Sequence, residues 1–133
     1  MNDDHIGFVR RGLFGATGLC CLAYAVLAVA LQRPDPFAWY IPGLMGAAAG
    51  FFLFLPNLFA AKASRLAWDE RYSVIARRSA SVAFWIMLVS FPVLGIARVQ
   101  SMLDVTVAYA ATGTLGAASY LLLNVWFDWK DDV

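Results

Sequence analysis

The chain has 133 residues, enough for one domain. Hydrophobic residues make up 62% of it and charged residues 14%, whereas a soluble domain has roughly 45–50% and 25%. The surplus apolar surface indicates contact with lipid, and the net charge of +1 gives no reason to expect a nucleic-acid partner.

Four long stretches of the chain contain no Asp, Glu, Lys, Arg or His. A helix needs roughly 20 apolar residues to cross a bilayer, and each stretch is about that long. The charge-free stretches are 12–32, 36–61, 79–97 and 105–127. They predict one all-α transmembrane domain over 1–133, an integral membrane four-helix bundle with spans at about 12–32, 38–61, 79–97 and 105–127.

The first span admits two interpretations. Arg10 and Arg11 precede an apolar run that ends in Ala28-Val29-Ala30, as in a cleavable signal peptide. The run is longer than the usual apolar region of a signal, and acidic residues precede it, which favours a retained helix. Cleavage after Ala30 would leave three spans, so both interpretations stay open.

Cysteine and histidine offer little chemistry. Cys20 and Cys21 are adjacent in the first span, and neighbouring residues do not share a helix face, so a bridge between them is not expected. The only histidine, His5, lies outside the spans. No metal site and no cofactor are predicted.

Small residues are spaced for close helix packing in two spans. Gly46 and Gly50 form a GxxxG pair in the second span. The fourth span has two small pairs at the same spacing, Gly113 with Ala117 and Thr112 with Gly116. Packing inside one bundle is the preferred interpretation, and a homodimer through Gly46 and Gly50 is the alternative. Most serines and threonines in the spans are expected to bond back to their own helix.

Positive charge predicts the orientation. Eight of the ten Lys and Arg residues fall on one side of a four-span chain, and cytoplasmic loops carry the excess of such residues. These eight are Arg10, Arg11, Lys62, Arg65, Arg71, Arg77, Arg78 and Lys130. Both termini and the loop 62–78 are therefore expected in the cytoplasm, in a multi-pass protein of the inner, cytoplasmic membrane.

The inner loop 62–78 is the longest polar stretch and is expected to be helical. Asp69 and Glu70 suit a helix start, from which the helix can continue into the third span. Tyr72, Ile75 and Ser79 then share one face.

Five residues of this loop are candidates for contact with a partner: Asp69, Glu70, Arg71, Arg77 and Arg78. The preferred interpretation is a helix cap with local ion pairing, with Arg77 and Arg78 at the depth of the lipid headgroups. A docking surface is the alternative. Catalysis is not expected, because an acid–base pair needs converging groups that this loop lacks.

Asp69-Glu70-Arg71, Ile75, Ala80 and Ala83-Phe84 together resemble the segment between the second and third spans in small prokaryotic four-span membrane proteins of uncharacterised families. The resemblance covers about 16 residues, the overall length and the number of spans. It implies the four-span architecture and assigns no activity.

The spans contain no ionisable side chain of the kind that marks a proton or ion pathway, and no catalytic residue is predicted. The function expected is therefore that of a non-enzymatic accessory or regulatory membrane protein, with lipid and a protein partner or a second copy as its contacts. The alternative is a small homo-oligomeric transporter or channel for an uncharged or lipophilic solute.

Overall fold

A computed structural model describes residues 3–59 and 70–132. This part of the chain is all-helical, as predicted, and contains no strand. Its four helices are α1 (Asp3–Leu31), α2 (Tyr40–Phe59), α4 (Glu70–Val99) and α5 (Val105–Asp132). Helix α4 begins at Glu70 and continues without a break through the predicted third span, as expected. The predicted loop helix over 62–69 lies outside the described residues.

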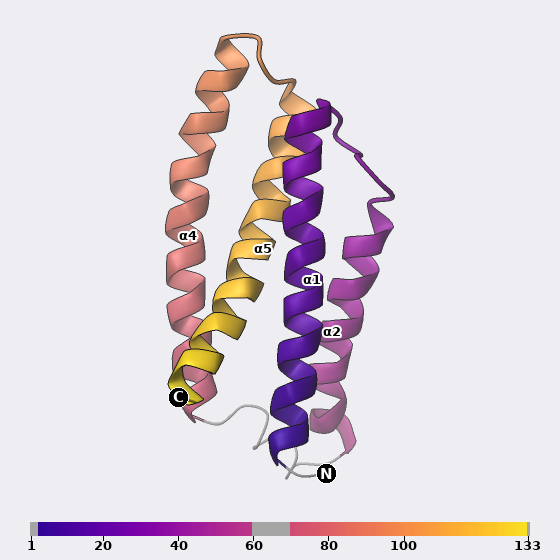
Figure 1. The fold of residues 1–133 in the computed structure, drawn as a ribbon, viewed down its shortest axis with the longest axis vertical. Coiled ribbons are helices and arrows are strands. Elements are labelled where there is room, and N and C mark those ends of the chain that lie inside the picture. The colour runs from indigo at the N-terminus through magenta and orange to yellow at the C-terminus, as the bar shows by residue number, and fades with distance from the viewer. Residues whose placement is uncertain (1–2, 60–69, 133) are drawn as a thin grey trace.

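The helices alternate in direction. In Figure 1, α1 and α4 run towards the upper end while α2 and α5 return, so the N-terminus, the C-terminus and the start of α4 lie at the same lower end. Neighbours pack in the order α4, α5, α1 and α2, and the α1–α5 interface is the largest. The first and last helices of the chain therefore form the centre of the molecule.

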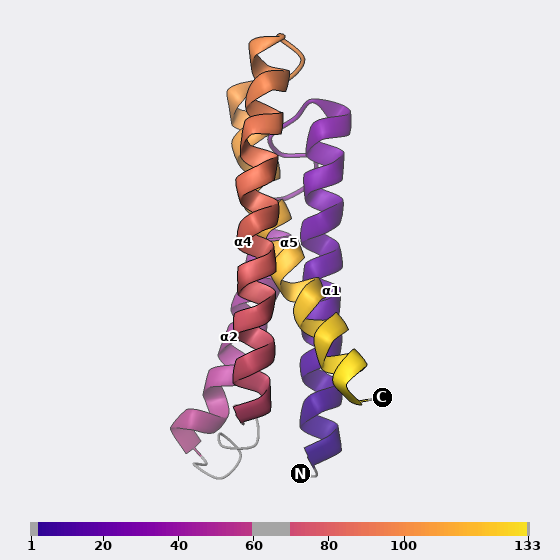
Figure 2. The ribbon, with the colours of Figure 1, turned by 90° about the vertical axis from the view of Figure 1, so that its left-hand side faces the viewer.

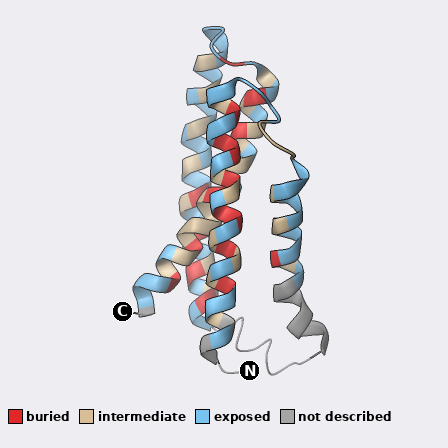
Figure 3. Ribbon diagram, turned by 45° about the vertical axis from the view of Figure 1, so that its right-hand side comes forward, coloured by how far each residue is buried: buried red, intermediate tan, exposed pale blue. Residues whose placement is uncertain are grey.

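One apolar cluster joins all four helices in the lower half. Phe14 of α1, Ala49 of α2 and Tyr72 of α4 are buried together, and Leu121 and Val125 of α5 pack against them. Figure 3 shows buried positions along α1, while much of the surface of α2 and α4 is exposed. The core is thus centred on α1 and α5.

Three of the described helices are long and apolar enough to cross a membrane: Gly7–Leu31, Glu70–Val99 and Val105–Asp131. They extend beyond the charge-free runs because their ends include charged turns, which the sequence assigned to loops. Helix α2 has 20 residues, a length of about 30 Å. Large apolar side chains such as Leu19 (61% exposed), Phe84 (60%) and Val89 (61%) face outwards, as expected for helices solvated by lipid.

The segment that follows α1 folds back and contacts that helix. The Tyr24 hydroxyl donates to the Asp35 carboxylate and lies within hydrogen-bond distance of the Pro34 carbonyl, at 2.9 Å in each case. The ring of Phe37 meets the Tyr24 ring edge-on, with centroids 5.0 Å apart. These contacts fix where the chain turns into α2.

Most polar groups within the helices are satisfied locally. The hydroxyls of Ser79, Thr112, Thr114 and Ser119 each donate to the carbonyl four residues earlier, at 2.6–2.8 Å. The expectation that these hydroxyls bond back to their own helix is confirmed. Both cysteines are free thiols.

Of the small residues predicted to pack in the fourth span, Gly113 and Ala117 are not covered by a described helix, whereas Gly116 is. Gly113 and Ala117 are both exposed, and a Cβ on Gly113 would meet no described atom within 4 Å. The close approach occurs instead at Gly116, where a Cβ would lie 2.9 Å from Met87 Cγ of α4. Small residues identify a helix that packs closely, but their spacing does not say which face is turned to the neighbour.

Gly18 permits the close approach of α1 and α5. A Cβ at this position would lie 2.9 Å from both Cγ and Cδ2 of Leu122 and 3.2 Å from Cβ of Leu121. At Gly12 of the same helix a Cβ would meet nothing within 4 Å.

We therefore expect Gly18→Leu to destabilise the protein by about 1–3 kcal/mol, because the added side chain overpacks the central interface. Gly12→Leu is the matched control and should leave stability nearly unchanged. Thermal unfolding in detergent, followed by circular dichroism, compares the two variants. Equal melting temperatures for both would contradict the α1–α5 packing described here.

Candidate functional site

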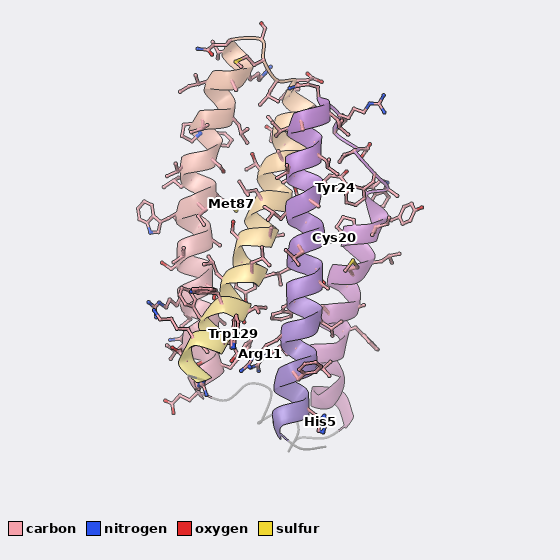
Figure 4. The ribbon with its side chains drawn as sticks, in the orientation of Figure 1. His5, Arg11, Cys20, Tyr24, Met87 and Trp129 are labelled. Atoms are coloured by element: carbon pink, nitrogen blue, oxygen red, sulfur yellow. The ribbon has the colours of Figure 1, made fainter. Side chains whose placement is uncertain are left out.

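A buried cluster of charges joins α1 to α5 at the end of the molecule that holds both termini. Arg10 Nη2 donates to Asp128 Oδ2 at 3.0 Å, and Arg11 Nε donates to the same oxygen at 2.8 Å. Arg10 is only 8% exposed and Asp128 only 4%. One carboxylate thus receives two guanidinium groups in a position almost closed to solvent. In Figure 4, Arg11 lies between α1 and the C-terminal part of α5.

Aromatic and amide groups surround these charges. The guanidinium carbon of Arg10 lies 4.1 Å from the centre of the Tyr72 ring of α4, a cation–π contact that strengthens when it is removed from water. Asn124 of α5 is one turn before Asp128 and 1% exposed. Its Nδ2 has no hydrogen-bond acceptor among the described residues. Three helices therefore contribute to one polar centre.

The positions of these residues follow from the charge-free runs. Arg10 and Arg11 directly precede the first run, and Asp128 directly follows the last. Because α1 and α5 are antiparallel neighbours, the start of one and the finish of the other lie at the same level. A helix that continues past its apolar run carries these charges into the bundle.

The chemistry of this cluster favours a fixed ion pair. Arginine stays protonated at any physiological pH. The two guanidiniums beside the Asp128 carboxylate stabilise its negative charge, so no proton transfer is expected between these groups. Both arginines contact the one aspartate, and the side chain of Arg11 remains 30% exposed. Among the described residues, no group of three or more His, Cys, Asp and Glu could hold a metal ion.

The candidate residues of the inner loop do not gather into one site in the described structure. Glu70 is the first residue of α4 and is exposed, as are Arg71 and Arg77. Arg78 turns towards α5, where its guanidinium carbon lies 4.4 Å from the centre of the Phe127 ring. Asp69 lies outside the described residues. The predicted shared face of Tyr72, Ile75 and Ser79 is confirmed, because all three are buried.

The second predicted feature, the GxxxG pair of α2, is uncovered. A Cβ on Gly46 or Gly50 would meet no described atom within 4 Å, and the same holds for Gly43. The buried residue of this helix is Ala49, which points to the Phe14 cluster. The preferred interpretation, packing of Gly46 and Gly50 inside the bundle, therefore finds no neighbouring helix among the described residues.

Sequence reasoning missed the role of Asp128 and of its partners on α1. Arg10 and Arg11 were interpreted as signs of orientation or of a signal peptide, and Asp128 was given no role. A usable signal was present, because opposite charges flank the first and last runs at positions that an even number of spans brings to the same side.

Comparisons of the chain with protein-family models, with curated proteins and with solved structures gave no significant match.

We expect Asp128→Asn to destabilise the protein by about 3 kcal/mol, because it removes the carboxylate that pairs with the buried guanidinium of Arg10. Asp131→Asn, at an exposed position one turn further along, is the matched control and should change stability by less than about 0.5 kcal/mol. Unfolding in detergent measures both.

The double variant Arg10→Gln with Asp128→Asn shows how much of the stability lost in Asp128→Asn comes from charge imbalance and how much from lost packing. Removing both charges should recover part of the stability lost in Asp128→Asn alone. A strictly additive loss would show that the two residues are not coupled.

Proposed function

We propose that this protein is a non-enzymatic accessory or regulatory membrane protein that binds a partner protein within the bilayer through α2. The observation that carries this proposal is the uncovered small-residue face of that helix. Gly43, Gly46, Ala47 and Gly50 lie on one side of α2, and nothing described covers the three glycines. In lipid, helices associate where small residues let their backbones approach.

The way α2 is attached supports the same proposal. Among the described elements its main neighbour is α1, and it contributes Ala49 to the shared core. Figures 1 and 2 show it at the edge of the molecule, beside α1 and away from the upper half of α4. A helix in this position can receive a second helix on its outer side without displacing any contact among the described residues.

The partner face can be tested with a matched pair of variants. Gly46→Leu with Gly50→Leu fills the small-residue face, whereas Ala48→Leu adds the same side chain at an exposed position on another side of α2. Because both glycines have open space around them, we expect the fold to remain intact. Co-purification in mild detergent should lose the partner in the glycine variant and retain it in Ala48→Leu.

Two outcomes would contradict this proposal. One is a solitary monomer in several mild detergents, and the other is a partner that remains bound when both glycines are replaced. If the co-purified partner is a second copy of the chain, the same variants should shift the protein from dimer to monomer.

The orientation also belongs to the proposal, with both termini and the start of α4 in the cytoplasm and the α4–α5 turn outside. The excess of Lys and Arg at the end that holds the termini supports it. We expect Ser101→Cys, in the exposed α4–α5 turn, to react with an impermeant maleimide added to intact spheroplasts. Ser73→Cys, near the start of α4, should react only after lysis, and the reverse pattern would invert the topology.

A further inference from the structure

A groove runs between α4 and α5 in the half of the molecule remote from the termini. It has a volume of about 340 Å³, and its walls include Met87, Phe91 and Leu94 on α4 and Val105 and Tyr109 on α5. Phe91 is 67% exposed and Tyr109 71%, so the walls reach the outer surface. This volume is at the lower end of the range of small-molecule sites, roughly 300–1,000 Å³.

Two glycines leave this groove unfilled. Gly95 and Gly113 both line it, and a Cβ at either would meet no described atom within 4 Å. The groove ends where α4 and α5 come together, at the contact between Met87 and Gly116. Figure 4 shows Met87 on α4 at about the middle of the helix.

The length of the groove matches one leaflet of a bilayer. Met87 and Arg98 both line it and are separated by 11 positions, a rise of about 16 Å along a helix. Half of a hydrocarbon core of about 30 Å is about 15 Å. The groove therefore extends from near the middle of the membrane to its surface, which is the path of one acyl chain.

Opposite charges lie only at the outer mouth of the groove. Arg98 lines it at that end and is exposed, and its side chain has no hydrogen bond or ion pair among the described residues. Asp104, at the start of α5, is near enough to experience the charge of Arg98. The Thr106 hydroxyl and the Val105 N–H both donate to the Asp104 carboxylate at 2.8 Å. These hydrogen bonds lower the pKa of Asp104, so its carboxylate is negative at neutral pH.

We propose that this groove binds one phospholipid whose headgroup carries both a phosphate and a primary amine, as in phosphatidylethanolamine. One acyl chain lies between α4 and α5 over Gly95 and Gly113. The phosphate pairs with Arg98, and the ammonium group lies beside Asp104. A purely anionic headgroup would gain from Arg98 but would be repelled by Asp104. A quaternary ammonium headgroup has no N–H to donate to the Asp104 carboxylate, so the pair favours a lipid with a primary amine.

The apolar runs of a second copy contain no charge to pair with Arg98 or Asp104, whereas a phospholipid headgroup supplies both a phosphate and an ammonium group. The site is also separate from the proposed partner face on α2, and the lipid proposal does not depend on that function.

Native mass spectrometry of the full chain tests the proposal. Delipidated protein in mild detergent is titrated with phosphatidylethanolamine, phosphatidylglycerol or phosphatidylcholine with the same acyl chains. We expect one phosphatidylethanolamine to bind more tightly than either of the other lipids. Gly95→Leu, which fills the groove, and Arg98→Gln, which removes the phosphate partner, should each weaken its binding about tenfold.

The controls distinguish a site from general lipid adhesion. Gly12→Leu adds the same side chain at an open position on α1 and should bind lipid like the unaltered protein, and Gly113→Leu should reproduce the effect of Gly95→Leu. Asp104→Asn should reduce the preference for phosphatidylethanolamine over phosphatidylglycerol.

Three results would overturn the proposal. The first is equal binding of all three lipids by the unaltered protein. The second is lipid binding by Gly95→Leu and Gly113→Leu that equals that of Gly12→Leu. The third is a dimer that both groove variants abolish, because a second copy would then occupy the groove.

Discussion

The ion pair between Asp128 and the two arginines of α1 is the interaction on which the rest of the arrangement depends. It ties the first helix to the last at a buried level, with Arg10 3.0 Å and Arg11 2.8 Å from the same oxygen. A buried pair of this kind contributes little net stability compared with apolar packing, but loss of one partner leaves an uncompensated charge. Its main effect is therefore on specificity, since a shift of α5 by one turn along α1 would separate the charges.

With α1 and α5 fixed in register, the other two helices take different roles. Helix α4 packs on α5 and supplies the Tyr72 ring that covers Arg10 at 4.1 Å, so the polar centre is built from three helices. Helix α2 joins the core through Ala49 and presents its glycines outwards. The two surfaces proposed for binding lie on α2 and in the groove between α4 and α5.

The sequence predicted the helical class, the continuation of α4 from Glu70 and the buried face of Tyr72, Ile75 and Ser79, because each depends on local composition and periodicity. It did not distinguish which of the small residues predicted to pack meet another helix of the described structure. Gly113 and Gly116 are equally small, yet only Gly116 faces Met87, since the rotation of a helix depends on its neighbours. Asp128 was missed for a related reason: a charge next to an apolar run was taken as the limit of a span, whereas the partners on α1 allow it to be buried.

The four charge-free runs also restrict where the protein can bind polar groups. Polar recognition is confined to the two ends of the helices, and at the end with the termini Asp128 is already paired with Arg10 and Arg11. At the opposite end Arg98 and Asp104 stand apart, at the mouth of an apolar groove that Gly95 and Gly113 leave open. Side chains at these two positions would fit without collision, so tight packing does not require glycine there. In the described structure, this groove is where apolar space lies next to charges of both signs, those of Arg98 and Asp104.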